Sequence, residues 1–256
     1  MIPKIIHYCW FGKNPIPEEQ ERFITRWKNI CPDWEIILWN ESNFDINSTI
    51  FTQKAYELKK YAFVSDYVRV WALDKFGGVY LDTDVEIKKN IDYFLKYEAF
   101  SCFETEGIPF TSAVWGSKKN HSLLKKLLKY YENKEYSLSE CPNTVLIGSI
   151  LEADFNIKPS ENINQVGSNG IDSINIFSSN YFCLDLPENY ASHHFFDSWA
   201  NSKKKNPYKN TIHEKYYINN LRVNDSYSKN TIKIFSKNLS FKNILWIIKY
   251  YIKNKF

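Results

Sequence analysis

Residues 61–87 read YAFVSDYVRVWALDKFGGVYLDTDVEI, and this stretch decides the fold that we predict. Its apolar residues recur at the spacing of one helix face, so we expect a helix from about residue 61 to residue 75. Two glycines (77–78) end that helix. A short apolar strand follows at 79–81, and a second candidate strand lies at 85–87. The stretch therefore predicts a helix, a glycine turn and a strand in direct succession.

The rest of the chain alternates between strand and helix patterns in the same way. Segments rich in β-branched and aromatic residues predict strands at 4–11, 34–40, 98–104, 111–117 and 174–186. Apolar residues at helical spacing predict a helix at 18–30, and an amphipathic segment predicts one at 120–133. A third helix is expected at 141–155, with Pro142 in its first turn. Strands that alternate with helices indicate an α/β domain with a mainly parallel central sheet.

Composition narrows the class of protein. The 256 residues suit one large domain, or one domain with a smaller appendage. A formal net charge of +4 is mild, so we do not expect a nucleic-acid binder, in which basic residues would cluster. The five cysteines are scattered without a Cys-x-x-Cys pair, which argues against a structural zinc site and fits a reduced, cytoplasmic protein. We expect neither a secretory signal nor a membrane span of roughly 18 apolar residues.

Asp82 and Asp84 interrupt what otherwise reads as a buried strand. Residues at i and i+2 of a strand point to the same face, so the two carboxylates are expected to converge. They would repel each other unless a cation lay between them, and hard oxygen ligands suit Mg²⁺ or Mn²⁺. Open α/β sheets also bind their ligands at the carboxyl ends of strands. The alternative is a solvated loop that carries two acids by chance.

The preceding helix contains the sequence SDYVR at residues 65–69. Asp66 and Arg69 lie three positions apart, so they share a helix face and can pair. Ser65 and this pair stand among apolar residues, on a helix that ends a few residues before the two aspartates. We therefore predict that the acid and the base serve the same site. The alternative is a surface salt bridge, which contributes little.

The segment AFVSDYVRVWALDKFGGVYLDTDVEI (62–87) fills the pattern A-x-x-S-D-x-x-R followed by L-x-x-x-G-G-x-Y-x-D-x-D. This pattern resembles the signature of glycosyltransferase family 32, which includes bacterial capsular-polysaccharide transferases and yeast Och-type mannosyltransferases. PKIIHYCWFG (3–12), PDWEIILWNE (32–41) and HHFFDSW (193–199) are similar to further segments of that family, in the same order. The large clostridial glucosylating toxins share the central blocks. The resemblance spans about residues 2–200.

The resemblance implies a GT-A fold, a Rossmann-like α/β domain over residues 1–200 that uses a nucleotide-sugar. Asp84 would bind a divalent metal, Mn²⁺ or Mg²⁺, and Asp82 would reach the metal through water or contact the ribose. His193 would be a further metal ligand, chosen over His194 by its place in the motif. The implied catalytic residues are Asp66, Arg69, Asp82 and Asp84. The implied donor-side residues are Trp10 on the base, Ser65 and Arg69 on the donor, Asp66 on ribose or sugar hydroxyls, Tyr80 in the donor-binding block, and Ser198 with Trp199 over the diphosphate.

The enzyme that this resemblance implies is a metal-dependent, retaining glycosyltransferase, with a UDP-sugar favoured over a GDP-sugar. It would transfer a sugar to a saccharide acceptor in the synthesis of capsular or other surface polysaccharide. Two alternatives stay open: a toxin-like transferase that modifies proteins, and a non-catalytic module that binds nucleotide-sugars. Thr111 and Ser112 stand where relatives often have an asparagine, so a contact to the donor sugar is expected to differ. Glu104 and Glu106 are candidates for acceptor contact, or belong to a solvated loop.

Residues 201–256 form a predicted C-terminal extension that is basic and aromatic. Within 236–256, lysines interleave with an apolar helix face. Such a helix can lie in the membrane interface, beside a lipid-linked acceptor on the inner face of the membrane. The alternatives are a helix that packs on the domain and a dimer contact, because the hydrophobic pattern alone does not separate them. The lysines are Lys237, Lys242, Lys249, Lys253 and Lys255, and the apolar residues are Phe241, Ile244, Leu245, Ile248 and Ile252.

Overall fold

The structure is a computed structural model that describes residues 1–186, 189–196, 212 and 240–255. Its strands are β1 (Ile5–Cys9), β2 (Glu35–Trp39), β3 (Gly78–Leu81), β4 (Val85–Ile87), β5 (Ala99–Cys102), β6 (Val114–Ser117), β7 (Gln165–Ser168), β8 (Ser173–Phe177) and β9 (Ala191–His193). Its α-helices are α1 (Glu18–Ile30), α2 (Ile50–Glu57), α3 (Tyr61–Phe76), α4 (Ser122–Tyr131), α5 (Asn143–Phe155) and α8 (Phe241–Lys255). Two short 3₁₀ turns lie at Ile46–Ser48 and Asp92–Lys96.

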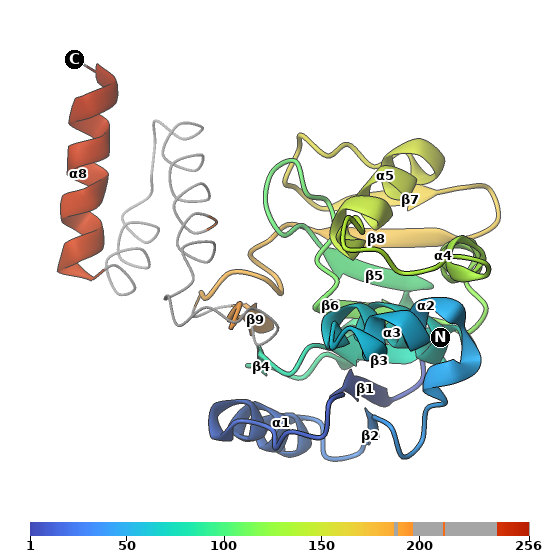
Figure 1. The fold of residues 1–256 in the computed structure, drawn as a ribbon. Helices are drawn as coiled ribbons and strands as arrows, with labels where there is room; N and C mark the ends of the chain where they lie inside the picture. Colours follow the sequence, from blue (N-terminus) through green and yellow to red (C-terminus); the bar gives the residue numbers. More distant parts are fainter. Residues whose placement is uncertain (187–188, 197–211, 213–239, 256) are drawn as a thin grey trace.

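Seven strands form the central sheet, in the order β2-β1-β3-β6-β5-β8-β7 (Figure 1). The pairs β1–β2, β1–β3 and β5–β8 are parallel, whereas β6 and β7 run antiparallel to their neighbours. The predicted α/β class with a mainly parallel sheet is therefore confirmed. The strand predicted at 174–186 is only partly correct, because β8 ends at Phe177 and the chain then turns, with the Tyr181 N–H donating to the Ser178 carbonyl.

The sheet separates two hydrophobic cores. Helices α2 to α5 cover one face (Figure 1), and their buried side chains pack with Tyr80 and Trp115. The other core contains Trp27 of α1 together with Val79 and Leu81. Side chains of β3 thus alternate between the two cores, as the two-residue period of a strand requires. The carboxyl end of β3, where the two aspartates follow, lies between these packed layers.

The turn between α3 and β3 depends on its two glycines. Gly77 has φ +68° and Gly78 has φ +115°, a region that side-chain-bearing residues rarely adopt. A Cβ atom at Gly78 would lie 2.7 Å from the Ile5 carbonyl oxygen. Glycine therefore allows α3 to stop and β3 to pair at once with β1, as the sequence pattern predicts.

Residues 85–87 form a strand but do not join the central sheet. They make β4, which pairs antiparallel with β9, so that Val85 lies opposite His193 and Ile87 opposite Ala191. The indole N–H of Trp27 donates to the Val85 carbonyl at 2.8 Å and fixes β4 to α1. This small second sheet is what brings the segment around residue 193 to the end of β3.

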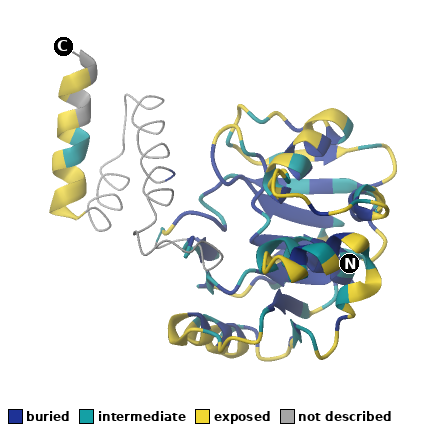
Figure 2. Ribbon diagram, viewed as in Figure 1, coloured by how far each residue is buried: buried dark blue, intermediate teal, exposed yellow. Residues whose placement is uncertain are grey.

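Helix α8 lies within the predicted C-terminal extension, and most of its described side chains are exposed (Figure 2). None of the described helices is long and apolar enough to cross a membrane. The predicted boundary at residues 200–201 falls outside the described residues, so this division of the chain stays a prediction.

Candidate functional site

The two aspartates occupy a tight turn at the end of β3. The Asp82 N–H donates to the Ala113 carbonyl at 2.9 Å, which ties the turn to the segment before β6. The Val85 N–H donates to the Asp82 carbonyl at 3.0 Å and turns the chain into β4. The turn therefore holds both carboxylates at the carboxyl end of a central strand, where α/β sheets place their ligands.

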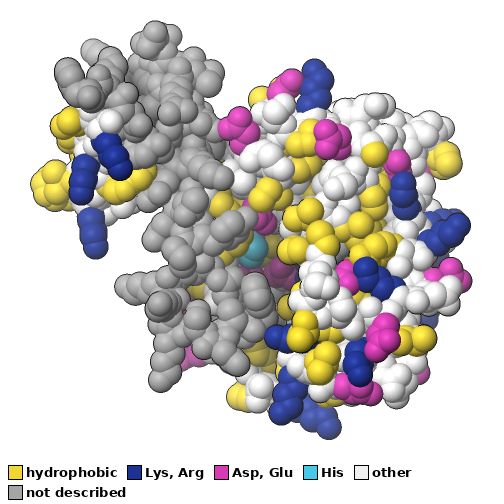
Figure 3. Space-filling view, turned by 45° about the horizontal axis from the view of Figure 1, so that its top comes forward, with side chains coloured by type: hydrophobic (Ala, Val, Ile, Leu, Met, Phe, Trp, Pro, Cys, Tyr) yellow, Lys and Arg dark blue, Asp and Glu magenta, His cyan; other side chains and the backbone are white. Residues whose placement is uncertain are grey.

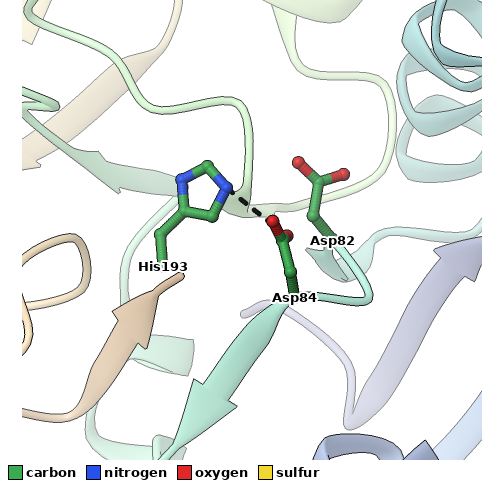
Figure 4. Close-up of side chains that lie close together, drawn as sticks. All are labelled: Asp82, Asp84 and His193. Carbon is green, nitrogen blue, oxygen red and sulfur yellow. Dashed lines mark ion pairs between the residues drawn. The ribbon is translucent and has the colours of Figure 1, made fainter. Parts of the chain in front are cut away.

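His193 lies beside Asp84 because β4 and β9 pair (Figure 4). Its Nε2 is 3.4 Å from Oδ1 of Asp84, and both side chains are largely buried, with exposed fractions of 12% and 13%. The Phe196 N–H donates to Oδ2 of the same carboxylate at 2.8 Å. The His194 N–H donates to the Asp84 carbonyl at 3.0 Å. The segment after β9 therefore wraps around Asp84 and fixes its orientation.

Asp84 and His193 each shift the pKa of the other toward its charged form. Burial alone would raise the pKa of Asp84, but the His193 imidazolium and the Phe196 N–H outweigh burial and hold that pKa below its ordinary value. Burial alone would lower the pKa of His193, but the Asp84 carboxylate outweighs it and raises that pKa. The carboxylate form of Asp84 is therefore favoured at neutral pH, which is the form that binds a cation.

Three side chains offer ligand atoms to one point. One atom each from Asp82, Asp84 and His193 lie within 4.8 Å of one another. Nε2 of His193 is the nitrogen that faces Asp84, whereas Nδ1, on the other side of the ring (Figure 4), is buried and has no hydrogen-bond partner among the described residues. Two carboxylate oxygens and one imidazole nitrogen form a donor set that suits Mn²⁺ or Mg²⁺. The residues present therefore fit a divalent cation, and in Figure 3 a histidine and acidic side chains are visible together at the surface.

Arg69 connects helix α3 to the aspartate turn. Its guanidinium lies 3.1 Å from Oδ1 of Asp66 and 3.4 Å from Oδ1 of Asp82. It also donates to the Ser112 carbonyl at 2.8 Å and lies over the ring of Tyr80, 4.4 Å from its centroid. The Arg69 side chain is only 5% exposed. The predicted i, i+3 pair is therefore a buried network rather than a surface salt bridge.

Tyr80 belongs to the same network. Burial raises the pKa of its phenol well above the ordinary value, so the hydroxyl stays protonated. It donates to Oδ1 of Asp82 at 2.9 Å. Tyr80 and Arg69 therefore both orient the Asp82 carboxylate through contacts to its Oδ1.

Asp66 is buried to about the same extent as Asp84 and His193, with a side chain that is 14% exposed. Burial raises its pKa to about 6, and the Arg69 guanidinium offsets burial only in part. Nδ2 of Asn143, the first residue of α5, lies 3.5 Å from Oδ1 of Asp66. Asn143 is buried, with 3% of the residue exposed, and its Oδ1 has no partner among the described residues. Sequence reasoning missed Asn143, whose only local signal is its place after Pro142 at a helix start.

The other predicted site residues vary in placement. Trp10 follows β1, is half-buried, and donates its indole N–H to the Asn14 carbonyl at 2.6 Å. Ser65 is half-buried, and its hydroxyl donates to the Tyr61 carbonyl one helical turn earlier. Ser198 and Trp199 lie outside the described residues. The donor-side roles of Trp10 and Ser65 stay predictions.

The acceptor candidates differ in exposure. Glu104 is buried, at 6% exposed, whereas Glu106 is exposed. Thr111 is fully buried, and its N–H donates to the Cys102 carbonyl at 2.8 Å. Ser112 enters the site through its backbone, as the acceptor for Arg69.

Residues 17–101 match the family model described as "Glycosyltransferase sugar-binding region containing DXD motif". The matched segment contains SDYVR and both aspartates of the turn. The match covers about a third of the chain, and over that segment the chain is similar to this glycosyltransferase family. The predicted class of enzyme is therefore confirmed, and so is the resemblance on which the prediction of a GT-A fold was based.

Curated relatives carry glycosyltransferase names. An uncharacterized glycosyltransferase of Acanthamoeba polyphaga mimivirus is 28% identical over 218 residues, which is 78% of this chain and 84% of that protein. Inositol phosphoceramide mannosyltransferase 3 of Schizosaccharomyces pombe is 32% identical over 132 residues, 50% of this chain and 36% of that protein. A mannosyl phosphorylinositol ceramide synthase of Saccharomyces cerevisiae is 28% identical over 58% of this chain and 40% of its own length. The chain thus spans less than half the length of these yeast enzymes.

Solved structures that are similar to this chain are also named as glycosyltransferases, and their sequence identity to it is lower. A glycosyltransferase involved in the glycosylation of the major capsid of PBCV-1 is 12% identical, covers 83% of this chain and 100% of its own, and has a TM-score of 0.45. A galactosyltransferase solved with donor and acceptor sugar analogues is 13% identical, covers 78% and 80%, and has a TM-score of 0.41.

Proposed function

We propose that this glycosyltransferase transfers a sugar from a nucleotide-sugar donor to a saccharide acceptor and depends on Mn²⁺ or Mg²⁺. The observation that carries the proposal is the convergence of Asp82, Asp84 and His193, whose ligand atoms lie within 4.8 Å of one another although the histidine is more than a hundred positions away in the sequence. When bound, the cation would act as a Lewis acid on the diphosphate leaving group.

The residues around the cluster would hold and orient the donor. Asp84 and His193 would hold the cation directly, and Asp82 would complete the set. Arg69 is already engaged with Asp66 and Asp82, so its role would be to position both carboxylates and to keep a fixed positive charge beside them. Asp66, which points into the same network, would accept hydrogen bonds from ribose or sugar hydroxyls.

Donor and acceptor are proposed on separate grounds. The family match ends at residue 101 and covers the SDYVR and aspartate blocks, so the similarity concerns the donor side. The family resemblance favours a UDP-sugar, whereas several relatives are named for mannosyl transfer, which makes a mannosyl donor the competing candidate. A lipid-linked or polysaccharide-bound saccharide is the proposed acceptor, and retention of the anomeric configuration is the proposed outcome.

A donor screen tests the proposal. Purified protein would be incubated with UDP- and GDP-sugars in the presence of Mn²⁺, Mg²⁺ or EDTA, and release of nucleoside diphosphate would be measured. We expect one donor to be cleaved only with a divalent cation, and proton NMR of the product to show retention. Equal turnover in EDTA would overturn the metal dependence, and binding of a nucleotide-sugar without any turnover would favour the non-catalytic module.

A matched pair of aspartate variants sharpens the screen. Asp84→Ala should lower donor cleavage and transfer by about a thousandfold, because a catalytic cation supplies several kcal/mol. Asp33→Ala is the control, since Asp33 is exposed and, among the described residues, its one ion pair is a surface pair with Lys4. Intact-mass measurement of candidate proteins after incubation separates protein modification from transfer to saccharides.

A further inference from the structure

We propose that helix α8 docks this protein on an anionic lipid surface. The helix would lie in the plane of the interface, with its apolar stripe among the acyl chains and its lysines at the headgroups. The proposal concerns a surface distinct from the aspartate turn, and it does not depend on the chemistry proposed for that turn.

The stripe runs the length of the helix. Its five members are spaced at i, i+3, i+4, i+7 and i+11, which places them on one helix face. All of them are exposed: Phe241 at 75%, Ile244 at 36%, Leu245 at 52%, Ile248 at 49% and Ile252 at 53%. Trp246 and Ile247 are half-buried and fall on the opposite side of the helix. The apolar stripe is therefore more exposed than the opposite side of the helix.

Positive charge follows one edge of this stripe. Lys242, Lys249 and Lys253 are all exposed, and their spacing places them in one row beside the apolar residues. In Figure 3, lysine and hydrophobic side chains lie next to each other on this helix. An apolar face with an adjacent row of lysines is the arrangement of helices that lie in a membrane interface.

Acidic and basic residues are also distributed unevenly along the chain, and the segment that contains α8 is the basic one. All 29 acidic residues precede residue 226, whereas residues 226–256 contain seven lysines and no acid. Because the net charge of the chain is +4, the part before residue 226 has a negative formal charge and the last part a strongly positive one. An anionic lipid surface complements this segment, and each lysine near such a surface contributes about 1 kcal/mol.

The length of α8 agrees with a helix that lies on a membrane and does not cross it. Fifteen residues extend for about 22 Å, which is shorter than the hydrocarbon core of a bilayer, about 30 Å. No described helix satisfies the length and hydropathy of a membrane span.

Vesicle sedimentation of the full chain tests the docking. Vesicles of phosphatidylcholine alone and of phosphatidylcholine with 30% phosphatidylglycerol would be mixed with the protein in EDTA, without any nucleotide-sugar. We expect strong binding to the anionic vesicles, weak binding to the neutral ones, and a clear loss at high salt. Equal binding to both vesicles, or none to either, would overturn the proposal. The assay needs no cation or turnover, so its failure and a failure of the proposed transferase reaction are distinguishable.

Two sets of lysine variants provide the control. The triple change Lys242→Gln, Lys249→Gln and Lys253→Gln should weaken binding to anionic vesicles about a hundredfold, at roughly 1 kcal/mol per lysine. The matched triple change Lys28→Gln, Lys125→Gln and Lys129→Gln removes three exposed lysines from α1 and α4 and should leave binding unchanged. An equal loss in both triples would indicate attraction by net charge alone and would contradict a role for α8.

The apolar stripe is tested separately. Leu245→Asn with Ile248→Asn should abolish binding while circular dichroism shows that the protein remains folded. Analytical ultracentrifugation of the unmodified chain addresses the competing occupant, a second copy. A dimer that these two changes dissociate, together with no binding to vesicles, would assign the stripe to self-association and reject the membrane.

Discussion

Two buried histidines, His7 and His193, show how differently one residue type is used in this fold. His7 lies on β1 and is fully buried, and both of its ring nitrogens have protein partners. Its Nδ1 accepts the indole N–H of Trp39 at 3.2 Å, and its Nε2 donates to the Gly77 carbonyl at 2.7 Å. His193 has the Asp84 carboxylate on one side and, among the described residues, no partner for Nδ1.

The two pKa values move in opposite directions for a physical reason. Burial lowers the pKa of His7 to about 4, and the carbonyl that it contacts offsets burial only slightly. His193 is also buried, but the negative charge of Asp84 outweighs burial and raises its pKa. Both histidines are buried, so the neighbouring charge, and not burial itself, decides whether the pKa of the ring falls, as in the core, or rises, as beside Asp84. The predictions below test this division, from the largest expected effect to the smallest.

Replacement of His193 should affect activity and not folding. His193→Ala removes one of three candidate ligands, so we expect donor cleavage to fall by about a thousandfold and to require more Mn²⁺ for the residual rate. Titration of activity with Mn²⁺ and thermal unfolding without metal would be measured together. A large loss of thermal stability with unchanged Mn²⁺ dependence would show that His193 belongs to the core, as His7 does.

The neutrality of His7 should make stability depend on pH. Its pKa is about 4 in the folded protein and ordinarily 6.5, so below pH 6.5 the unfolded chain binds a proton that the folded protein does not. The free energy of unfolding therefore falls as the pH decreases from 6.5 to 4, by about 3 kcal/mol for this group.

Urea unfolding of the unmodified chain and of His7→Gln at pH 7.5 and pH 4.5 would measure this contribution. The variant should have a lower free energy of unfolding than the unmodified chain at pH 7.5. At pH 4.5 this difference in the free energy of unfolding should be smaller by most of the roughly 3 kcal/mol derived above. A difference independent of pH would mean that His7 carries a proton in the folded protein.

Oδ1 of Asn143, like Nδ1 of His193, is a buried polar atom that has no hydrogen-bond partner among the described residues. Asn143→Ala should raise the KM for the donor about tenfold and leave kcat less affected, since one hydrogen bond to a charged or sugar group contributes about 1.5 kcal/mol. A fall in stability with no change in KM would assign Asn143 to the core.

His194 is the neighbouring histidine for which the smallest effect is expected. Its ring stacks on Phe23 at 4.9 Å, and its Nε2 lies 3.2 Å from Oε2 of Glu86, away from the aspartate turn. His194→Gln should change donor cleavage by less than about threefold, as a partly exposed pair contributes at most about 1 kcal/mol. A loss comparable to that of His193→Ala would reverse the assignment of the two histidines.

Much of this site could be predicted because its first half is local in the sequence. Asp66 and Arg69 share a helix face through a spacing of three, and Asp82 and Asp84 meet because two glycines end α3 just before a short buried strand. These relations follow from the periods of helix and strand, which any reader of the sequence can apply. The buried character of the Arg69 network was the part that spacing alone left undecided.

The second half of the site required tertiary structure. The local pattern made His193 and His194 equivalent, and only the family resemblance favoured the first. The antiparallel register of β4 and β9 places His193 opposite Val85 and beside Asp84. Asn143 is 77 positions from Asp66 and reaches it because the fold brings the first residue of α5 next to that side chain. The sequence by itself therefore determined the α/β alternation, the aspartate pair and the helix-borne acid and base, because these depend on local periodicity. Tertiary structure decided which histidine and which amide join them, because strand register and helix packing are set by contacts between distant segments.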